Sequence, residues 1–222
     1  MKTHTKTLLA ALTASAMLAG SAHAALIPVT VTNGFTTNRL DELTDGSGIT
    51  KGDANDPTTW DVTGGNGSFA DESFGDPLVG ATNGKLGWYT FDLGSDQDLG
   101  EVYVAMGRYI FGGSTLTLGS FNLYLADTPT VAPTNAGDYD FASGGWTQIG
   151  GTTTFATAGS DIEIDVAGNS ARFVGIEIMS DFNTSDARTG MNEFAVTAIP
   201  EPGSLALLGL GGLLIGARRR RD

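Results

Sequence analysis

Carboxylates, hydroxyls, amides and aromatic rings are the side chains with which this protein could do chemistry. The 222-residue chain has no cysteine, and its two histidines, His4 and His23, both lie near the N-terminus. A body without imidazole or thiol groups excludes histidine-dependent serine or cysteine catalysis and the usual zinc and copper sites. The formal net charge of −13 also disfavours nucleic acid as a partner. Three possibilities remain: hydrolysis by a carboxylate pair, a calcium ion held by oxygen atoms, and ligand binding without catalysis.

Hydrolysis by two carboxylates requires surroundings that push their pKa values apart. The candidate acids fall into three groups, which are Asp161, Glu163 and Asp165; Asp138 and Asp140; and Asp96 and Asp98. The first group alternates with isoleucine and valine in DIEIDV, which indicates the solvent face of a strand. The other two groups lie in turn-like sequence. None has apolar surroundings that would raise one pKa above its partner's, so no catalytic residue is expected.

A better candidate for ligand binding is the stretch GRYIFGGST, residues 107–115. Sugars stack on aromatic faces, and their hydroxyl groups hydrogen-bond to charged side chains. Arg108, Tyr109 and Phe111 are therefore candidate ligand-binding residues. The alternative interpretation is that these aromatic rings pack beside a hairpin.

The elements that would position these residues are short strands. Runs rich in β-branched and aromatic residues alternate with clusters of glycine, threonine, aspartate and asparagine. This pattern predicts an all-β protein, built as an antiparallel sandwich or jelly roll. The region 33–86 is predicted to be rich in loops. The predicted strands are 26–32, 88–93, 101–107, 119–126, 146–150, 152–157, 161–166, 171–179 and 193–198.

Both ends of the chain carry targeting features. Lys2 and Lys6 precede an apolar stretch that ends in Ala-His-Ala, which is typical of a secretory signal peptide cleaved after Ala24. Near the other end, the apolar run 203–217 is too short and too rich in glycine for a lasting membrane helix. Four arginines follow it and favour the cytoplasmic side, which indicates transient association with the inner membrane. They are Arg218, Arg219, Arg220 and Arg221.

The C-terminal segment resembles a known sorting signal. Pro200, Glu201 and Pro202, followed by the apolar run and the arginines, resemble the PEP-CTERM signal of bacteria that make exopolysaccharide. This resemblance implies processing by exosortase, a membrane protease, and delivery to the cell surface or the extracellular matrix. The alternative is an ordinary tail anchor. The expected organisation is a signal peptide at 1–24, a β-sandwich at 25–199 and a sorting signal at 200–222.

The body resembles discoidin-like modules with the galactose-binding fold. The resemblance rests on four stretches in the same order, residues 43–60, 88–104, 171–182 and 190–196. It implies a jelly-roll sandwich whose ligand loops gather at one end. Two features depart from the family pattern. The stretch between Trp60 and Trp88 is longer than the family's usual first loop, and the disulfide common in the family is impossible without cysteine.

The same resemblance implies a structural calcium ion between the first loop and the last strand. Calcium takes six to eight oxygen ligands, including backbone carbonyls, and such an ion would join the two ends of the domain. The alternative interpretation is that these residues cap turns and the start of a strand. The matching positions are Asp53, Asn55, Asp56, Thr58 and Glu193, with Asp45 as the alternative ligand if the loop has a different register.

These observations favour an exported, non-catalytic module that binds extracellular polysaccharide. The acidic charge makes neutral glycans the first expected ligands. Two alternatives remain open: a structural or adhesive surface protein without a glycan site, and a carboxylate-dependent enzyme that cleaves glycans.

Overall fold

The computed structural model describes residues 24–46, 51–53, 56–61, 73–76, 78–105, 110–111, 114–115, 118–156, 161–182 and 189–199. One compact unit comprises Leu26–Ile199, and the other comprises Met1–Ala25 and Pro200–Asp222. The helices expected at the two chain ends lie outside the described residues. Within the described part, no helix is long and apolar enough to cross a membrane.

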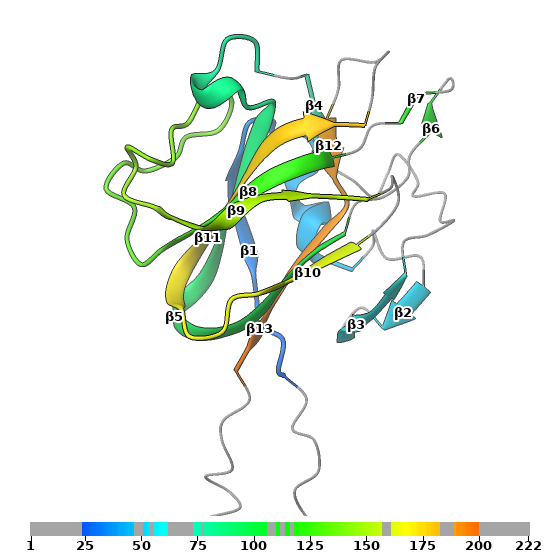
Figure 1. Ribbon diagram of the computed structural model, residues 1–222, viewed down its shortest axis with the longest axis vertical. Helices are drawn as coiled ribbons and strands as arrows, with labels where there is room; N and C mark the ends of the chain where they lie inside the picture. The colour runs from blue at the N-terminus through cyan, green and yellow to red at the C-terminus, as the bar shows by residue number, and fades with distance from the viewer. Residues whose placement is uncertain are drawn as a thin grey trace, which may run out of the picture. The chain divides into compact units, whose positions relative to one another are not determined.

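The compact unit Leu26–Ile199 is built from antiparallel strands in two layers (Figure 1). The larger layer has the order β1 (Thr30–Gly34), β5 (Gly87–Ala105), β11 (Ser170–Asp181), β8 (Leu118–Ala126) and β9 (Thr147–Thr154). The second half of β5 pairs instead with β10 (Asp161–Asp165) and β13 (Glu193–Ala198). All of these pairings are antiparallel, so the prediction of an all-β antiparallel fold is confirmed.

Strand β5 belongs to both layers. The sequence predicts two strands here, 88–93 and 101–107, with a turn between them. In the structure they form one strand of 19 residues, and Gly94 at φ +82° takes up the local irregularity. The backbone partner changes from Ser170, opposite Asp98, to Ala198, opposite Leu99. Strand β5 continues while its partner changes from β11 to β13. The residues predicted to form a turn therefore mark the point where β5 passes from one layer to the other.

The boundaries of strand β9 also differ from the prediction. The sequence predicts separate strands at 146–150 and 152–157, whereas the structure has one strand at Thr147–Thr154. Gly150, at φ +66°, lies within it. β13 covers the predicted 193–198, whereas β1 runs over Thr30–Gly34 and not over the predicted 26–32. In β10, Ile162 and Ile164 pack against the core while the three acids between and beside them are exposed, as the alternation predicts.

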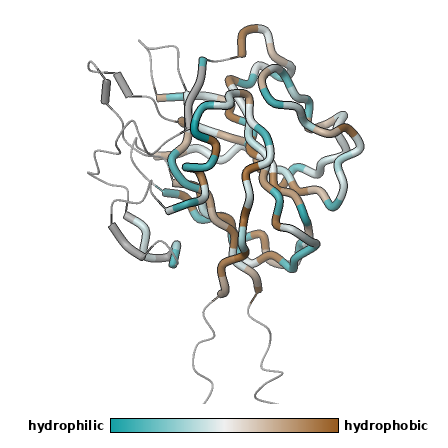
Figure 2. The backbone as a smooth tube through the Cα atoms, turned by 180° about the vertical axis from the view of Figure 1, so that it is seen from behind, coloured by the Kyte–Doolittle hydropathy of each residue, from teal (hydrophilic) through white to brown (hydrophobic). Residues whose placement is uncertain are grey.

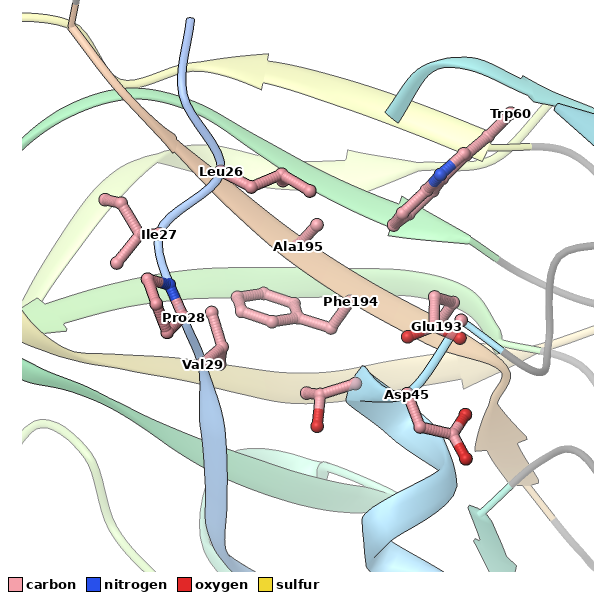
Figure 3. A pocket seen from close by; sticks show the side chains of 11 residues that line it. Leu26, Ile27, Pro28, Val29, Asp45, Trp60, Glu193, Phe194 and Ala195 are labelled. Atoms are coloured by element: carbon pink, nitrogen blue, oxygen red, sulfur yellow. The ribbon is translucent and has the colours of Figure 1, made fainter. Parts of the chain in front are cut away.

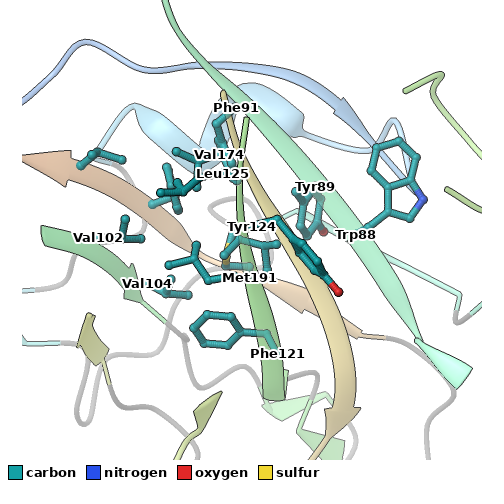
Figure 4. Close-up of a cluster of buried hydrophobic side chains, with 14 of the residues drawn as sticks. Trp88, Tyr89, Phe91, Val102, Val104, Phe121, Tyr124, Leu125, Val174 and Met191 are labelled. Atoms are coloured by element: carbon teal, nitrogen blue, oxygen red, sulfur yellow. The ribbon is translucent and has the colours of Figure 1, made fainter. Parts of the chain in front are cut away.

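The main core lies between the two layers. Figure 4 shows Phe91 and Val174 of the larger layer gathered with Val102 and Val104 from the second half of β5. Across the same core, the rings of Phe91 and Phe194 stack at a centroid distance of 3.8 Å. This stacking fixes β13 against the larger layer.

A second aromatic cluster covers the outer face of the larger layer. The segment 127–146 lies over β5, β11 and β8 and contributes Tyr139, Phe141 and Trp146, all buried. Phe141 stacks on Tyr124 of β8 at 4.6 Å, and the Trp88 indole N–H donates to the Gly137 carbonyl at 2.8 Å. Figure 4 shows Trp88 pointing away from the main core. The sequence predicts a turn at Asp138 and Asp140 and a strand from Trp146, whereas the structure shows that this segment also adds three buried aromatic rings to the hydrophobic core.

Shorter elements complete the described fold. β2 pairs with β3, β4 pairs with β12, and β6 pairs with β7. Several of them lie in the region expected to be rich in loops. They are η1 (Leu40–Thr44), β2 (Lys51–Asp53), β3 (Asp56–Asp61), β4 (Ser73–Gly75), η2 (Thr82–Gly84), β6 (Ile110–Phe111), β7 (Ser114–Thr115) and β12 (Thr189–Met191).

The start and the end of the body lie side by side. Leu26 forms an antiparallel bridge with Thr197, and the Ile27 N–H donates to the Val196 carbonyl at 2.9 Å. The Ile199 N–H donates to the Asp98 carbonyl at 3.1 Å. Figure 2 shows the apolar residues of both body ends next to each other. Since Pro200 follows Ile199 directly, the C-terminal segment begins without a spacer at this end of β13.

Candidate ligand and metal site

A hollow of about 280 Å³ lies where the N-terminal segment, η1, β3 and β13 meet. Figure 3 shows the aliphatic side chains of Ile27, Pro28 and Val29 on one side, and the carboxylates of Asp45 and Glu193 on the other. An indole ring and two acids beside one hollow could receive either a sugar or a cation. The lining residues are Leu26, Ile27, Pro28, Val29, Thr44, Asp45, Gly46, Trp60, Glu193, Phe194 and Ala195.

The polar residues of this hollow are held by different elements. Glu193 begins β13, opposite Ala105 of β5, and is only 2% exposed. Asp45 ends the short helix η1 and is exposed. Trp60 belongs to β3, and its ring meets the edge of the Tyr103 ring at a centroid distance of 6.1 Å. The site therefore joins residues that are far apart in sequence.

The structure brings together only part of the predicted calcium set. Glu193 borders the hollow with Asp45, which is the alternative ligand of the sequence analysis. Asp56 is half-buried and does not line the hollow. Asp53 and Thr58 belong to β2 and β3, but their side chains, like all of Asn55, lie outside the described residues. Among the described residues there is no group of three or more acidic, histidine or cysteine side chains that could hold a metal ion.

The predicted glycan-binding residues fall on the hairpin of β6 and β7. The backbone of Phe111 lies opposite that of Ser114, while Arg108, Tyr109 and the Phe111 side chain lie outside the described part of the chain. The hairpin follows β5, whose last residue, Ala105, pairs with the first residue of β13. In the sequence, the hairpin therefore comes after the Ala105 end of β5. The point near Asp98 where β5 passes from one layer to the other lies further back along the strand.

The surroundings of Glu163, beside Glu101, differ from those expected from the sequence. Burial first, and then the nearby charge of Glu101, raise the pKa of the Glu163 carboxyl. The Tyr103 hydroxyl donates to Glu101 Oε2 at 2.5 Å, and burial raises the pKa of Tyr103. The expectation that no acid in the DIEIDV group has a raised pKa is therefore wrong.

Two other hollows border the segment 127–146. One, of about 220 Å³, is mainly apolar and includes Phe173 beside Thr32 and Pro133. Next to it, Arg172 holds Asp92 through two hydrogen bonds of 2.9 and 2.8 Å, which lower the pKa of Asp92. The other, of about 390 Å³, lies near the end of β8 and includes Leu125, Ala126, Asp127, Thr128, Gly145, Thr147, Ile149, Asn169 and Ser170.

Comparison with known proteins identifies the C-terminal segment and finds similar folds. Residues 198–221 match the PEP-CTERM protein-sorting motif, which confirms the interpretation of the tail. No curated protein matches the chain.

Similar solved structures include a fucose-binding module of Streptococcus pneumoniae, with 12% identity, a TM-score of 0.45, and coverage of 78% of this chain and 91% of that one. A family 32 carbohydrate-binding module of C. perfringens NanJ in complex with galactose has 9% identity, a TM-score of 0.42, and coverage of 78% and 97%. A family 32 module of Streptococcus pneumoniae EndoD has 14% identity, a TM-score of 0.43, and coverage of 78% and 99%.

Proposed function

We propose that this protein is an exported β-sandwich that is processed by exosortase and binds a neutral extracellular glycan without cleaving it. The PEP-CTERM motif at 198–221 makes it an exported protein sorted to the cell surface. During sorting, the apolar run 203–217 would hold the protein transiently at the inner membrane. The bound glycan would be an exopolysaccharide at the surface or in the matrix.

The observation that carries this proposal is that the PEP-CTERM motif at 198–221 comes at the end of an antiparallel β-sandwich. Along β13, Glu193 pairs with Ala105, close to the hairpin, whereas Ala198 pairs with Leu99, where the motif begins. Five steps along a strand span roughly 17 Å. The two ends of β13 are therefore well separated along the second layer, and the β6–β7 hairpin follows in sequence from the Ala105 end.

A binding role also fits the chemistry of the described acids better than hydrolysis does. Burial and the nearby charge of Glu101 raise the pKa of Glu163, but Glu163 lies on the exposed face of β10 and lines none of the three hollows in which a glycosidic bond could be held. An aromatic and cationic hairpin can instead stack on a sugar ring and hydrogen-bond to its hydroxyls. We therefore assign no catalytic residue.

Replacing the hairpin aromatics is the direct test of glycan binding. In Tyr109→Ala or Phe111→Ala, the affinity for the producer's own exopolysaccharide, or for a neutral glycan found on an array, is expected to fall about tenfold or more, which is about 1.4 kcal/mol. The matched control is Val131→Ala, because Val131 is a well-exposed apolar residue on the segment 127–146. Affinity is measured by titration calorimetry, and polymer length by size-exclusion chromatography.

Each outcome of this experiment favours a different function. Binding without shortening of the polymer supports the proposal, and loss of binding in the hairpin variants alone locates the site. Shortened polymer would replace the proposal with a glycan-cleaving enzyme. If no glycan binds, a structural or adhesive surface protein becomes the better description.

We also propose that a calcium ion binds beside Glu193 and stabilises the fold. Asp45 and Glu193 border the same hollow, and Asp53, Asn55, Asp56 and Thr58 would have to supply the further oxygen ligands. Because Glu193 opens the last strand, the ion would join the beginning of the body to its end. A carboxylate buried as deeply as Glu193 is suited to this role.

Calcium is expected to raise the midpoint of thermal unfolding, and a chelator is expected to lower it. A site filled at 100 times its dissociation constant stabilises the folded state by about 2.7 kcal/mol. Glu193→Gln should abolish most of the shift, whereas Glu163→Gln, on the exposed face of β10, should leave it unchanged. An identical midpoint of unfolding with calcium and with chelator would contradict the proposal that calcium stabilises the fold.

A further inference from the structure

A lysine ammonium lies between two carboxylates under the segment 127–146. Lys85, just before β5, has a fully buried side chain, and its Nζ lies 2.8 Å from Asp138 Oδ1 and 3.4 Å from Glu177 Oε1. It also donates to the Thr82 carbonyl at 3.2 Å. The contacts to Thr82 and Glu177 are hydrogen bonds, and the contact to Asp138 is an ion pair.

Glu177 is fixed in place from its other side. Its Oε2 accepts hydrogen bonds from Asn122 Nδ2 at 3.0 Å and from the Tyr124 hydroxyl at 2.8 Å. Asn122 is itself held by the Thr152 hydroxyl, which donates to Asn122 Oδ1 at 2.7 Å. Glu177 is fully buried, so its Oε1 is held toward the lysine nitrogen by a network of hydrogen bonds.

Asp138 presents its two oxygens to different partners. Oδ1 faces Lys85, while Oδ2 accepts from the Thr82 backbone N–H at 2.7 Å and from the Thr82 hydroxyl at 2.6 Å. Burial raises the pKa of Asp138, but the hydrogen bonds from Lys85 and Thr82 outweigh it and lower that pKa to about 2. The starting state is therefore an ion pair with two donors on the oxygen away from the lysine.

We propose that Lys85 and Asp138 condense into an intramolecular isopeptide bond, with Glu177 as the residue that transfers protons between them. Glu177 takes one proton from the ammonium group and passes it to Asp138 Oδ1. The neutral Nζ then attacks Cγ, and the C–N bond forms. Glu177 carries a second proton from the nitrogen to the Oδ1 hydroxyl, which leaves as water. Oδ2 remains as the amide carbonyl oxygen, Nζ keeps one hydrogen, and no oxidant or other reactant is needed.

The geometry supplies what this condensation requires. The amine and the carboxyl group are already in contact, and such fixed proximity replaces the encounter of two free molecules. The Thr82 N–H and hydroxyl point at the oxygen on which negative charge develops as the nitrogen attacks. The product also removes one buried ammonium and one carboxylate, whose desolvation is costly even when they are paired.

The bond would have a clear structural consequence. It would join the start of β5 to the segment 127–146, on the outer face of the larger layer. In an exported protein without cysteine, such a link would hold this segment in the way that a disulfide does elsewhere, by limiting the unfolded chain.

Peptide mass spectrometry of the full chain from its producer tests the proposal. Trypsin does not cleave after a lysine whose amine is acylated, so the expected product is a branched peptide in which residues 52–108 are joined to residues 109–172. Its mass should be lower than the sum of the two peptides by one water molecule. Ordinary cleavage after Lys85, with no branched peptide, would overturn the proposal and leave an ion pair.

Two variants and their controls assign the roles. Glu177→Gln keeps the size of the side chain but cannot transfer protons, and Asp138→Ala removes the reacting carboxyl from a partly exposed position. Both should lack the branched peptide, whereas Glu163→Gln and Asp140→Ala should retain it. If Glu177→Gln fails to fold, Asp138→Ala still decides whether that carboxyl is the partner, and a branched peptide persisting in Asp138→Ala would contradict the assignment.

Discussion

Phe141→Ala is expected to lower the free energy of unfolding by about 3–5 kcal/mol, the range for removing a buried phenylalanine ring. Phe141 is fully buried on the outer face of the larger layer. Its ring stacks on Tyr124 at 4.6 Å and meets the edges of the Tyr139 and Trp146 rings at 5.1 Å each. Truncation would leave a cavity under the segment 127–146 and remove these ring contacts together with the one to Trp88.

Chemical denaturation with tryptophan fluorescence measures this loss, since Trp88 and Trp146 both belong to the cluster. Hydrogen exchange should also become faster in 127–146, because the segment loses its main attachment. Phe182→Ala is the matched control, because Phe182 is partly exposed and its removal should cost much less. A variant as stable as the parent would mean that 127–146 does not depend on this ring.

Gly175→Val is expected to destabilise the protein by roughly 3 kcal/mol through overpacking. Gly175 lies in β11 opposite Tyr124 of β8. A Cβ atom at this glycine would stand 2.2 Å from an edge carbon of the Phe141 ring, so the ring would have to move. The ring cannot move freely, because Tyr124 lies against its face. Gly175 is therefore required for the outer aromatic cluster to sit on the sheet.

Combining the two substitutions separates this clash from any general weakening of the strand. In the Phe141→Ala background, Gly175→Val should cost much less, because the ring that blocks the new side chain is gone. The resulting coupling energy is read from the four unfolding curves of a double-mutant cycle. Gly151→Val is the control, because a Cβ at Gly151 meets nothing within 4 Å. Strictly additive losses would show that the Phe141 contact does not limit position 175.

Exposed acidic residues and buried charged residues are subject to different physical constraints. Exposed acids such as those of β10 remain in water and cost little, whereas Lys85, Glu177 and Glu193 are buried. A buried ionisable group requires partners. These three buried residues lie at two sites. Lys85 and Glu177 belong to the isopeptide candidate, and Glu193 borders the hollow beside β13.

Local patterns in the sequence were sufficient for several features. Alternation in DIEIDV predicted which face of β10 packs inward, and the run EFAVTA predicted β13, because the side-chain direction in a strand depends only on position parity. The absence of cysteine and the position of both histidines limited the available chemistry. The charge and hydropathy of the last residues identified the sorting motif, since such signals are linear.

Only the tertiary structure decided the features that depend on long-range pairing. The merging of 88–93 and 101–107 into β5 depends on partners from β10, β11 and β13, which no local window contains. The meeting of Asp45 with Glu193 depends on how η1 packs beside β13. Lys85, Asp138 and Glu177 meet because the segment 127–146 covers the sheet with aromatic rings. In the sequence, Asp138 was indistinguishable from any other turn aspartate.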